Sequence, residues 1–248
     1  MRRFTVAPEH IADGRVAFDR DESRHLVHVL RLRPGDTVIA SDGAGHDYTV
    51  RLETLGDAVT GTVLEVAEHD AESPLAVTLL QGVPKGDRME NIVRAATELG
   101  VARVCPALTE RTVVRLDAAR WRERTRRWQR VAREATKQCR RAVIPTVDPP
   151  RPLAEWLAEL APADLGLCVW EGSVSSVATV LGRRERVPRS ALLLVGPEGG
   201  LAQAEVDAAR AQGMAVVSLG PRTLRTETAG PAVLAILQSR WGDMGGGR

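Results

Sequence analysis

Two loops in the second half of the chain combine residue types that suit a ligand site. The first is the run Gly-Pro-Glu-Gly-Gly at 196–200, which follows the apolar residues 192–195 and precedes a helical pattern over 201–212. In open α/β sheets, ligands bind in the crevice outside the carboxyl ends of the strands. Glycines let the backbone approach a ligand there, and Glu198 adds a carboxylate acceptor. A tight turn without any ligand accounts for the same residues and stays open as the alternative.

The second loop covers 218–231 and is rich in polar groups. It carries Arg222, Arg225 and Glu227, together with three threonines, ahead of the last expected helix. A loop that lines a site uses such a density of charged and hydroxyl groups. The alternative is an exposed charged loop whose threonines cap the following helix.

Several common chemistries lack their motifs in this chain. There is no GxGxxG, no GxxxxGK[ST] and no GxSxG, so a Rossmann dinucleotide site, a P-loop and a serine hydrolase are not expected. All five histidines fall within the first 70 residues. A site in the remaining chain therefore works without imidazole, unless the two halves share it. The three cysteines form no CxxC pair, and the HxxH of His25 and His28 has no second ligand pair, so we expect no metal site.

A third feature is the strongly basic stretch 111–141. It holds eleven arginines and one lysine against three acidic residues, whereas the whole chain has a net charge of +2. Such a local excess is typical of a surface that binds a polyanion, although a solvated helix face also carries charge runs. We interpret the stretch as a contact with nucleic acid phosphates. An earlier stretch offers Arg24, Arg31 and Arg33, and Arg2 and Arg3 are further candidates of the same kind.

The elements that position these residues change character near residue 72. Before it, short β-prone segments separated by turn signals predict a small β-barrel, interrupted by one helix at 23–32. After it, strands alternate with amphipathic helices, which predicts a mostly parallel sheet covered on both faces. We expect strands at 2–6, 15–18, 36–41, 47–52, 58–66, 76–81, 101–106, 165–170, 191–195 and 215–219, and further helices at 87–99, 117–140, 201–212 and 228–241.

Composition excludes several classes of protein. The chain has 248 residues, of which 44% are hydrophobic and 27% charged, so it is too apolar for a disordered protein and long enough for one or two domains. No apolar run approaches the roughly 18 residues of a membrane span, and the first residues do not have the pattern of a signal peptide. We expect a cytoplasmic protein with no membrane contact.

Taken together, these segments resemble the RsmE family, the small-subunit ribosomal RNA uridine-N3 methyltransferases of the SPOUT (α/β-knot) class. The resemblance covers nearly the whole chain. It rests on HLVHVLRLRPGD at 25–36, PKGDRME at 84–90, ATELG at 96–100, ERTV at 110–113, VGPEGG at 195–200 and SLGPRTLRTETA at 218–229. The last two motifs are the most specific. The segment 133–141 departs from the family pattern, because Lys137 and Arg140 stand where the family has Glu and Gly.

The resemblance implies an α/β fold in which a PUA-like, RNA-binding β-barrel (1–72) precedes a trefoil-knotted SPOUT methyltransferase domain (73–248). It implies S-adenosyl-L-methionine as cofactor, 16S ribosomal RNA of the small subunit as substrate, and a homodimer with sites at the subunit interface. The cofactor-binding residues that we expect are Gly196, Pro197, Glu198, Gly199, Gly200, Leu219, Gly220, Leu224, Thr226 and Thr228. The expected RNA-binding residues are Arg2, Arg3, Arg24, Arg31, Arg33, Arg111 and Arg133.

Methylation at N3 of uridine requires an unpaired base and the loss of the N3 proton. With no histidine in this part of the chain, Glu227 or Glu198 is the candidate base, and Arg225 is the candidate for stabilising negative charge on the uracil oxygens. Solvent as the proton acceptor and a purely structural Glu198 stay open. A SPOUT ribose 2′-O-methyltransferase and a catalytically silent RNA-binding protein are the alternative functions.

Overall fold

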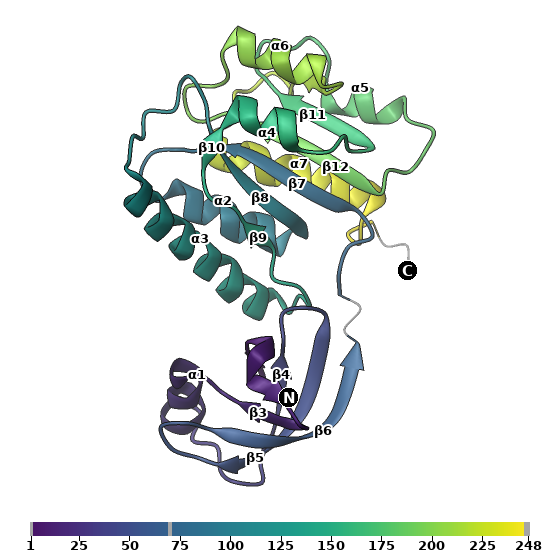
Figure 1. Cartoon of the computed structure of the whole chain (residues 1–248). Helices are drawn as coiled ribbons and strands as arrows, with labels where there is room; N and C mark the ends of the chain where they lie inside the picture. The colour runs from purple at the N-terminus through teal and green to yellow at the C-terminus, as the bar shows by residue number, and fades with distance from the viewer. Residues whose placement is uncertain (1, 69–70, 246–248) are drawn as a thin grey trace. The chain divides into compact units, whose positions relative to one another are not determined.

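Two structural units make up the chain in a computed structural model that describes residues 2–68 and 71–245 (Figure 1). The first unit contains Met1–Glu72 together with the separate segment Thr136–Ile144, and the second contains Ser73–Ala135 together with Pro145–Arg248. The sequence pattern changes once, near residue 72, and gives no signal that 136–144 packs with the first unit. Each unit has its own sheet and is described by itself.

The first unit is built on one six-stranded sheet with the order β1-β4-β5-β6-β3-β2. Its pairs are antiparallel except that of β1 with β4. Alternate residues of β4 and β5, including Val38, Val50 and Leu52, enter a core that also holds Phe4 and Leu26. The strands are β1 (Arg3–Thr5), β2 (Ile11–Ala12), β3 (Arg15–Ala17), β4 (Thr37–Ser41), β5 (His46–Thr54) and β6 (Thr60–Glu68). All five strands expected here form, and the two-residue β2 is an addition.

The helix expected at 23–32 starts earlier and changes its winding. α1 (Arg20–Arg24) begins after Asp19, whose carboxylate accepts the amide of Glu22 at 2.8 Å and so caps the helix. The chain then continues as a π-helical turn, η2 (His25–Val29). A short 3-10 turn, η1 (Pro8–His10), precedes β2.

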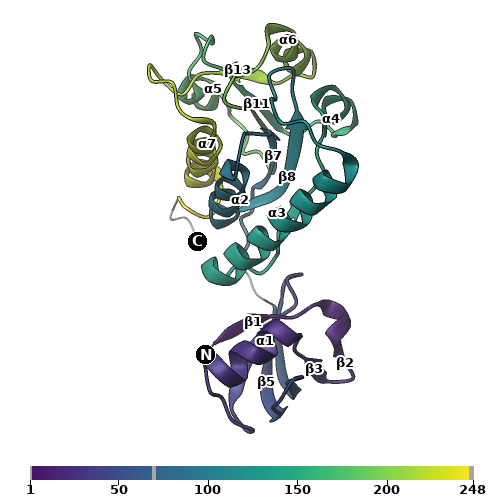
Figure 2. The same cartoon turned by 90° about the vertical axis from the view of Figure 1, so that its left-hand side faces the viewer.

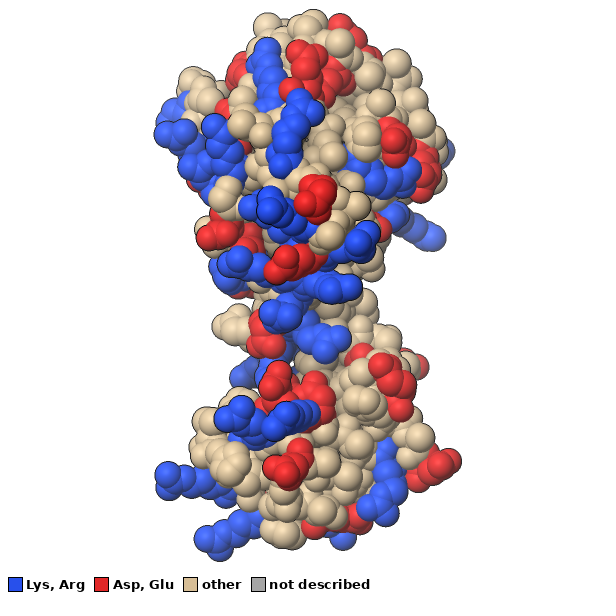
Figure 3. Space-filling view, turned by 60° about the vertical axis from the view of Figure 1, so that its left-hand side comes forward, with Lys and Arg blue, Asp and Glu red and all other residues tan. Residues whose placement is uncertain are grey.

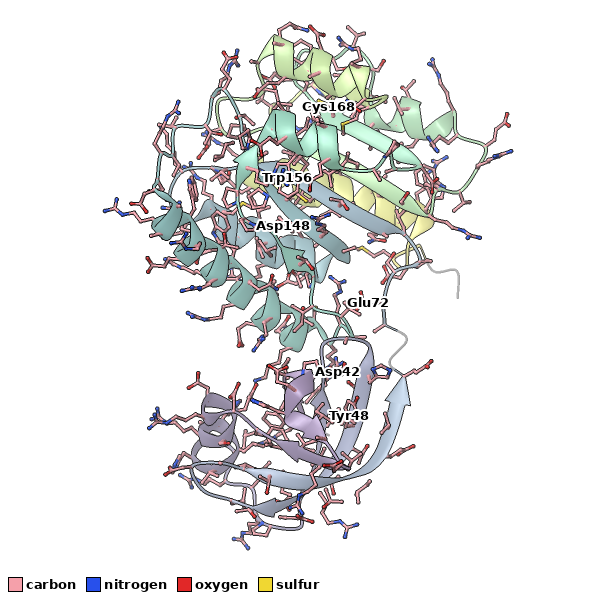
Figure 4. The ribbon with its side chains drawn as sticks, viewed as in Figure 1. Asp42, Tyr48, Glu72, Asp148, Trp156 and Cys168 are labelled. Carbon is pink, nitrogen blue, oxygen red and sulfur yellow. The ribbon has the colours of Figure 1, made fainter. Side chains whose placement is uncertain are left out.

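Glu72 joins the segment 136–144 to the rest of the first unit; it is labelled in Figure 4. Its carboxylate accepts the guanidinium of Arg141 and, at 3.0 Å each, the amides of Ala142 and Val143. Arg141 is buried, so loss of the Glu72 carboxylate would leave a buried guanidinium unpaired, which costs more than the loss of an exposed pair. The amide of Ile144 also donates to the carbonyl of Gly43 at 3.0 Å.

The second unit is a parallel sheet with helices on both faces (Figures 1 and 2). The strand order is β10-β8-β7-β12-β11-β13, with β9 beside β8, and every pairing is parallel. The strands are β7 (Ala76–Gly82), β8 (Val101–Leu108), β9 (Thr146–Val147), β10 (Arg151–Pro152), β11 (Leu165–Val169), β12 (Ser190–Val195) and β13 (Ala215–Val217). Because the strands run the same way, their carboxyl ends meet at one edge of the sheet.

Helices cover both faces of this sheet. α4 (Leu153–Glu159) and α6 (Gln203–Ala211) pack on the face that carries Leu80 and Leu194. α2 (Arg88–Glu98) and α7 (Thr226–Trp241) pack together, and α7 contacts β7 and β12 on the opposite face. α3 (Ala118–Cys139) and α5 (Val177–Gly182) complete the unit, although the last turn of α3 belongs to the first unit. The expected helices all form, and α4, α5, β9 and β10 were not anticipated.

Candidate active site

A cavity of about 520 Å³ opens at the carboxyl ends of β11, β12 and β13. Its walls are residues 169–171 at the end of β11, 195–198 and 200 at the end of β12, and 218–225 after β13, together with the first turn of α7. The two loops singled out in the sequence thus meet in one cavity. Its position outside the strand ends and its volume are typical of small-molecule sites, which span roughly 300–1,000 Å³.

Close backbone packing dictates the glycines of the turn after β12. A Cβ on Gly196 would lie 2.9 Å from the carbonyl carbon of Gly200. Gly200 has a φ of +72°, and a Cβ there would lie 2.9 Å from the carboxylate of Glu171. The turn closes where the amide of Gly200 donates to the carbonyl of Pro197 at 2.9 Å. Any larger residue at either position would distort this wall of the cavity.

A chain of buried hydrogen bonds connects β7, the glycine turn and α7 beside the cavity. The side-chain amide of Gln81, at the end of β7, donates to the hydroxyl of Thr226 at 2.9 Å and to the carbonyl of Gly82 at 3.0 Å. The Thr226 hydroxyl donates in turn to the carbonyl of Gly196 at 2.7 Å. Both side chains are buried, so these bonds fix β7, the glycine turn and α7 relative to one another.

Glu198 is bound on the rim of the cavity by residues that precede α2. Its carboxylate accepts the amide of Lys85 at 2.9 Å and the guanidinium of Arg88. Partial burial alone would raise the pKa of Glu198, but these hydrogen bonds, that of its own amide and the charge of Arg88 outweigh burial and lower the pKa. A carboxylate with a lowered pKa is a weaker base, so the geometry favours a structural role for Glu198 over proton abstraction.

Glu227 and Arg225 lie next to this rim. The Oε1 atom of Glu227 is 3.8 Å from Nε of Arg88, and its Oε2 atom is buried without a hydrogen-bond partner among the described residues. Arg225 is exposed on the cavity wall, where its backbone begins α7, and its guanidinium has no carboxylate partner in the described part of the chain. One carboxylate oxygen and one guanidinium are therefore both unpaired at this end of the site.

The expected cofactor residues divide into those that line the cavity and those that do not. Gly199 does not line it; its carbonyl accepts the guanidinium of Arg111 at 2.8 Å. Thr228 does not line it either and is exposed on α7. Glu227, expected as a candidate base and not as a cofactor residue, is also absent from the cavity wall. The remaining eight line it: Gly196, Pro197, Glu198, Gly200, Leu219, Gly220, Leu224 and Thr226.

The cavity also includes residues outside the expected cofactor set, although the family resemblance implies that the loop after Trp170 lies near the pocket and Arg222 belongs to the second loop. Trp170 and Glu171 extend β11 into the site, and Arg222 lines the cavity as Arg225 does. The position of Trp170 and Glu171 after an apolar strand was the available signal, because parallel strands end at the same edge. Arg88 belongs to the PKGDRME motif at 84–90, but nothing in the sequence connects it with its partner Glu198, 110 residues away.

The expected RNA-binding arginines differ in the exposure of their side chains and in whether the guanidinium already has partners within the protein. Arg3 is occupied inside the first unit, where its guanidinium bonds to Asp47 at 2.7 Å and to Ser41 at 2.9 Å, and its side chain is only 11% exposed. The others are exposed: Arg2, Arg24, Arg31 and Arg33 in the first unit, and Arg111 and Arg133 in the second.

Two thiols lie in the sheet, where Cys168 is labelled in Figure 4. Burial raises the pKa of both Cys105 and Cys168 to about 12, and Asp148 adds to the effect on Cys105. Neither is a thiolate at neutral pH, so neither is a nucleophile. Among residues 2–68 and 71–245, no group of histidine, cysteine or acidic side chains is arranged to bind a metal ion, and no helix could cross a membrane.

The family models and the curated proteins that match this chain are all RNA methyltransferases. Residues 71–238 match the model of an RNA methyltransferase domain, and residues 18–62 match that of an RNA methyltransferase PUA domain. The ribosomal RNA small subunit methyltransferase E of Synechocystis is 36% identical over 94% of this chain and 76% of its own length. The protein of that name from Bacillus subtilis is 33% identical over 84% of each chain.

Solved structures of related proteins have a similar fold over nearly their whole length. A ribosomal RNA small subunit methyltransferase E from Neisseria gonorrhoeae, bound to S-adenosyl methionine, has a TM-score of 0.87 and 34% identity, over 98% of this chain and 99% of that one. A putative methyltransferase from Legionella pneumophila, also with the bound cofactor, has a TM-score of 0.87 and 30% identity over 97% and 98%.

Proposed function

The chain belongs to the ribosomal RNA small subunit methyltransferase E family, with a PUA-like unit followed by a SPOUT-like methyltransferase domain, and from this we propose that it transfers a methyl group from S-adenosyl-L-methionine to N3 of a uridine in 16S ribosomal RNA. The observation that carries the proposal is the cavity at the ends of β11, β12 and β13, built from the two loops that carry the family's most specific motifs.

The residues of this cavity fit S-adenosyl-L-methionine. The glycine turn carries no side chain at Gly196 or Gly200, where a Cβ would meet the turn itself or Glu171, so main-chain groups border the cavity and a ligand can lie against them. Trp170 and Leu219 supply apolar surface for a nucleoside, and the Glu171 carboxylate and Arg222 guanidinium supply opposite charges for an amino acid group that carries both. The cofactor, once bound there, presents a methyl group on a positively charged sulfur.

The proposed chemistry assigns one proton transfer and one charge-stabilising contact to the chain. Glu227 takes the N3 proton of the uracil on its carboxylate, and the N3 electron pair freed in this way would be the nucleophile for the methyl group that the bound cofactor would supply. Arg225 donates to the uracil oxygens, where negative charge develops when N3 loses its proton. Glu227 is assigned in preference to Glu198 because Lys85 and Arg88 already bind the Glu198 carboxylate, whereas Oε2 of Glu227 has no partner among the described residues. Since Glu227 does not line the cavity, its side chain must rotate toward the uracil to take the proton.

The proposal includes contacts with the rest of the ribosomal RNA. Exposed Arg2, Arg24, Arg31 and Arg33 of the first unit, and Arg111 and Arg133 of the second, are proposed to contact phosphates, which position the RNA without reading its sequence. Arg3 is the weakest member of the expected set, because Asp47 and Ser41 already occupy its guanidinium. We place the reaction in the cytoplasm, where small ribosomal subunits are assembled.

We further propose that the working enzyme is a homodimer. From Ala229 to Leu237, α7 carries no charged or strongly polar side chain, and its apolar residues are spread around the helix. A helix that is apolar on every side is usually buried on every side. In this chain Ile236 remains 38% exposed, and a second copy would cover it.

The test is methyl transfer to small ribosomal subunits that lack the uridine modification. The protein is incubated with labelled S-adenosyl-L-methionine, and the RNA is digested to nucleosides that are identified by mass. We expect label in 3-methyluridine. Label in a 2′-O-methyl nucleoside would move the acceptor to the ribose, and failure to bind the cofactor would leave only an RNA-binding protein.

A further inference from the structure

Four arginines form a row on α3 that takes no part in the cavity. Arg122, Arg126, Arg130 and Arg133 follow one another at steps of four, four and three residues, which places them within an arc of about 80° on the helix surface. All four are exposed, and none forms an ion pair with a carboxylate among the described residues, although the charge of Arg122 acts on Asp117 at the start of the helix. We call them the α3 arginine row.

Other arginines of the same helix are neutralised. Arg127 forms an ion pair with Glu90 of α2 at 2.8 Å, and Arg120 lies 3.7 Å from Asp117. The charge of these two residues is used within the protein. Arg124, on the same side of α3 as these two, has no ion pair among the described residues either, so what distinguishes the row is that four unpaired guanidiniums share one arc of the helix.

A contribution to the stability of α3 does not explain why these four arginines are present. Arg122 and Arg126, and likewise Arg126 and Arg130, are like charges four residues apart, an arrangement that destabilises a helix. The row does not hold α3 in place either, because the helix packs through Trp128, Ala132 and other residues of a different side. In Figure 3, which turns the side of the molecule bearing α3 toward the viewer, blue Lys and Arg side chains gather on this surface.

Positive charge connects this row to the rim of the cavity. The guanidinium of Arg111 donates to the carbonyl of Gly199 at 2.8 Å, in the glycine turn itself. Glu205 of α6 holds the same loop by accepting the amide of Glu110 at 2.8 Å. From Arg111 the chain passes through exposed Arg115 to the start of α3. A polyanion that enters the cavity thus meets arginines along the way to the row.

We propose that the α3 arginine row binds successive phosphates of the ribosomal RNA strand that delivers its uridine to the cavity. Eleven residue steps of α-helix cover about 16 Å, a distance over which a strand presents several phosphates. Arginine suits this contact because its planar guanidinium makes paired hydrogen bonds to phosphate oxygens. The proposal rests on the proposed function for the identity of the polyanion and adds the surface along which that polyanion runs.

The test measures how salt weakens the binding of unmodified 16S ribosomal RNA transcript, by filter binding between 50 and 200 mM salt, for the full chain and for R122Q/R126Q/R130Q/R133Q. Glutamine keeps the helix propensity of arginine and removes the charge. Each lost phosphate contact lowers the slope of log affinity against log salt concentration by about 0.7 to 0.9. We expect the slope to fall by about 3 in the variant, with unchanged cofactor binding and unchanged circular dichroism.

A matched control removes four exposed arginines elsewhere in the second unit, R94Q/R183Q/R186Q/R189Q. Three of these precede β12, at the opposite end of the sheet from the cavity, so the slope should change by less than 1. The row is excluded as the RNA contact if both variants change the slope equally, or if the row variant keeps the slope of the unaltered protein. If the protein binds RNA through the row but transfers no methyl group, the proposed function is wrong and the proposed RNA contact stands.

Discussion

At the residue scale, Arg222 and Arg225 both line the cavity between β13 and α7 and give a matched pair of variants. If Arg225 stabilises the charge that develops on uracil, R225A should lower turnover at saturating RNA and cofactor by about 100-fold, the usual cost of losing one such donor. R222A should act mainly on cofactor affinity. Normal turnover of R225A in a single-turnover methylation assay would contradict the role assigned to Arg225.

Glu198 allows a prediction about pH. Its pKa is lowered below the ordinary value of 4.5 by the hydrogen bonds from Lys85 and Arg88, which outweigh burial. A lowered pKa in the folded state means that the ionised group stabilises the protein above pH 4.5 and loses this effect as pH falls through the folded-state value.

E198Q should therefore be less stable than the unaltered protein by a constant amount above about pH 6, and the difference should shrink below about pH 4.5. Urea denaturation at a series of pH values measures it. R88Q is the companion variant, because it removes the same ion pair from the other side. A difference that grows on acidification would show that Glu198 is not held as a carboxylate.

The site residues differ in how far sequence could identify them. Gly196 to Gly200 and Arg225 could be singled out because they lie in two short motifs that each follow an apolar strand. Arg88 could not, because only the folded chain brings it to Glu198 and Glu227. Arg3 shows the reverse case: a basic residue near the start of the chain looks like a phosphate contact until Asp47, 44 residues away, is found to pair with it.

At the scale of elements, Thr226 is the residue through which the start of α7 holds the turn after β12. T226V removes the hydroxyl at nearly constant volume and leaves the buried carbonyl of Gly196 and the amide of Gln81 each short of a partner. We expect a loss of about 1–3 kcal/mol in the free energy of unfolding and weaker cofactor binding.

T226S is the control, since serine keeps the hydroxyl. Urea denaturation and calorimetric titration with S-adenosyl-L-methionine would measure the two effects. Equal stability of T226V and T226S would show that the buried chain does not hold these elements together.

The structure of the individual elements also explains why the sequence did not predict some of them. The long helices α2, α3 and α6 carry several turns of apolar periodicity, which a sequence displays directly. α4 has only seven residues, begins at Pro152 without a side-chain cap, and is held by tertiary contacts such as the bond from Nε1 of Trp156 to the carbonyl of Pro106 at 2.9 Å. β9 and β10 are two residues each and exist only as partners of β8. Such elements follow from packing, which local pattern does not encode.

At the scale of the whole molecule, the chain does not follow the simple order of its two sequence patterns. The segment Thr136–Ile144 belongs to the first unit although it lies within the second pattern, and Glu72 holds it through side-chain and backbone hydrogen bonds. Nothing in the sequence pattern signalled this packing, although the same segment departs from the family pattern at Lys137 and Arg140. Lys137 pairs with Glu22 of the first unit at 2.6 Å, so one of the two departures serves this packing.

The proposed homodimer is the property of the whole molecule that α7 makes testable. I236E places a charge on the exposed apolar side of this helix, and burying an unpaired carboxylate between two copies would be costly. In light scattering after size exclusion, the unaltered protein should have twice the mass of the chain and I236E the mass of one. V187E, at a residue that is 67% exposed outside α7, should remain dimeric.

Because the family resemblance implies that the sites lie at the subunit interface, I236E should also lose most methyl transfer while keeping its far-ultraviolet circular dichroism. A monomeric unaltered protein at micromolar concentration, or a dimeric I236E, would remove α7 from the interface and leave its apolar surface to another partner.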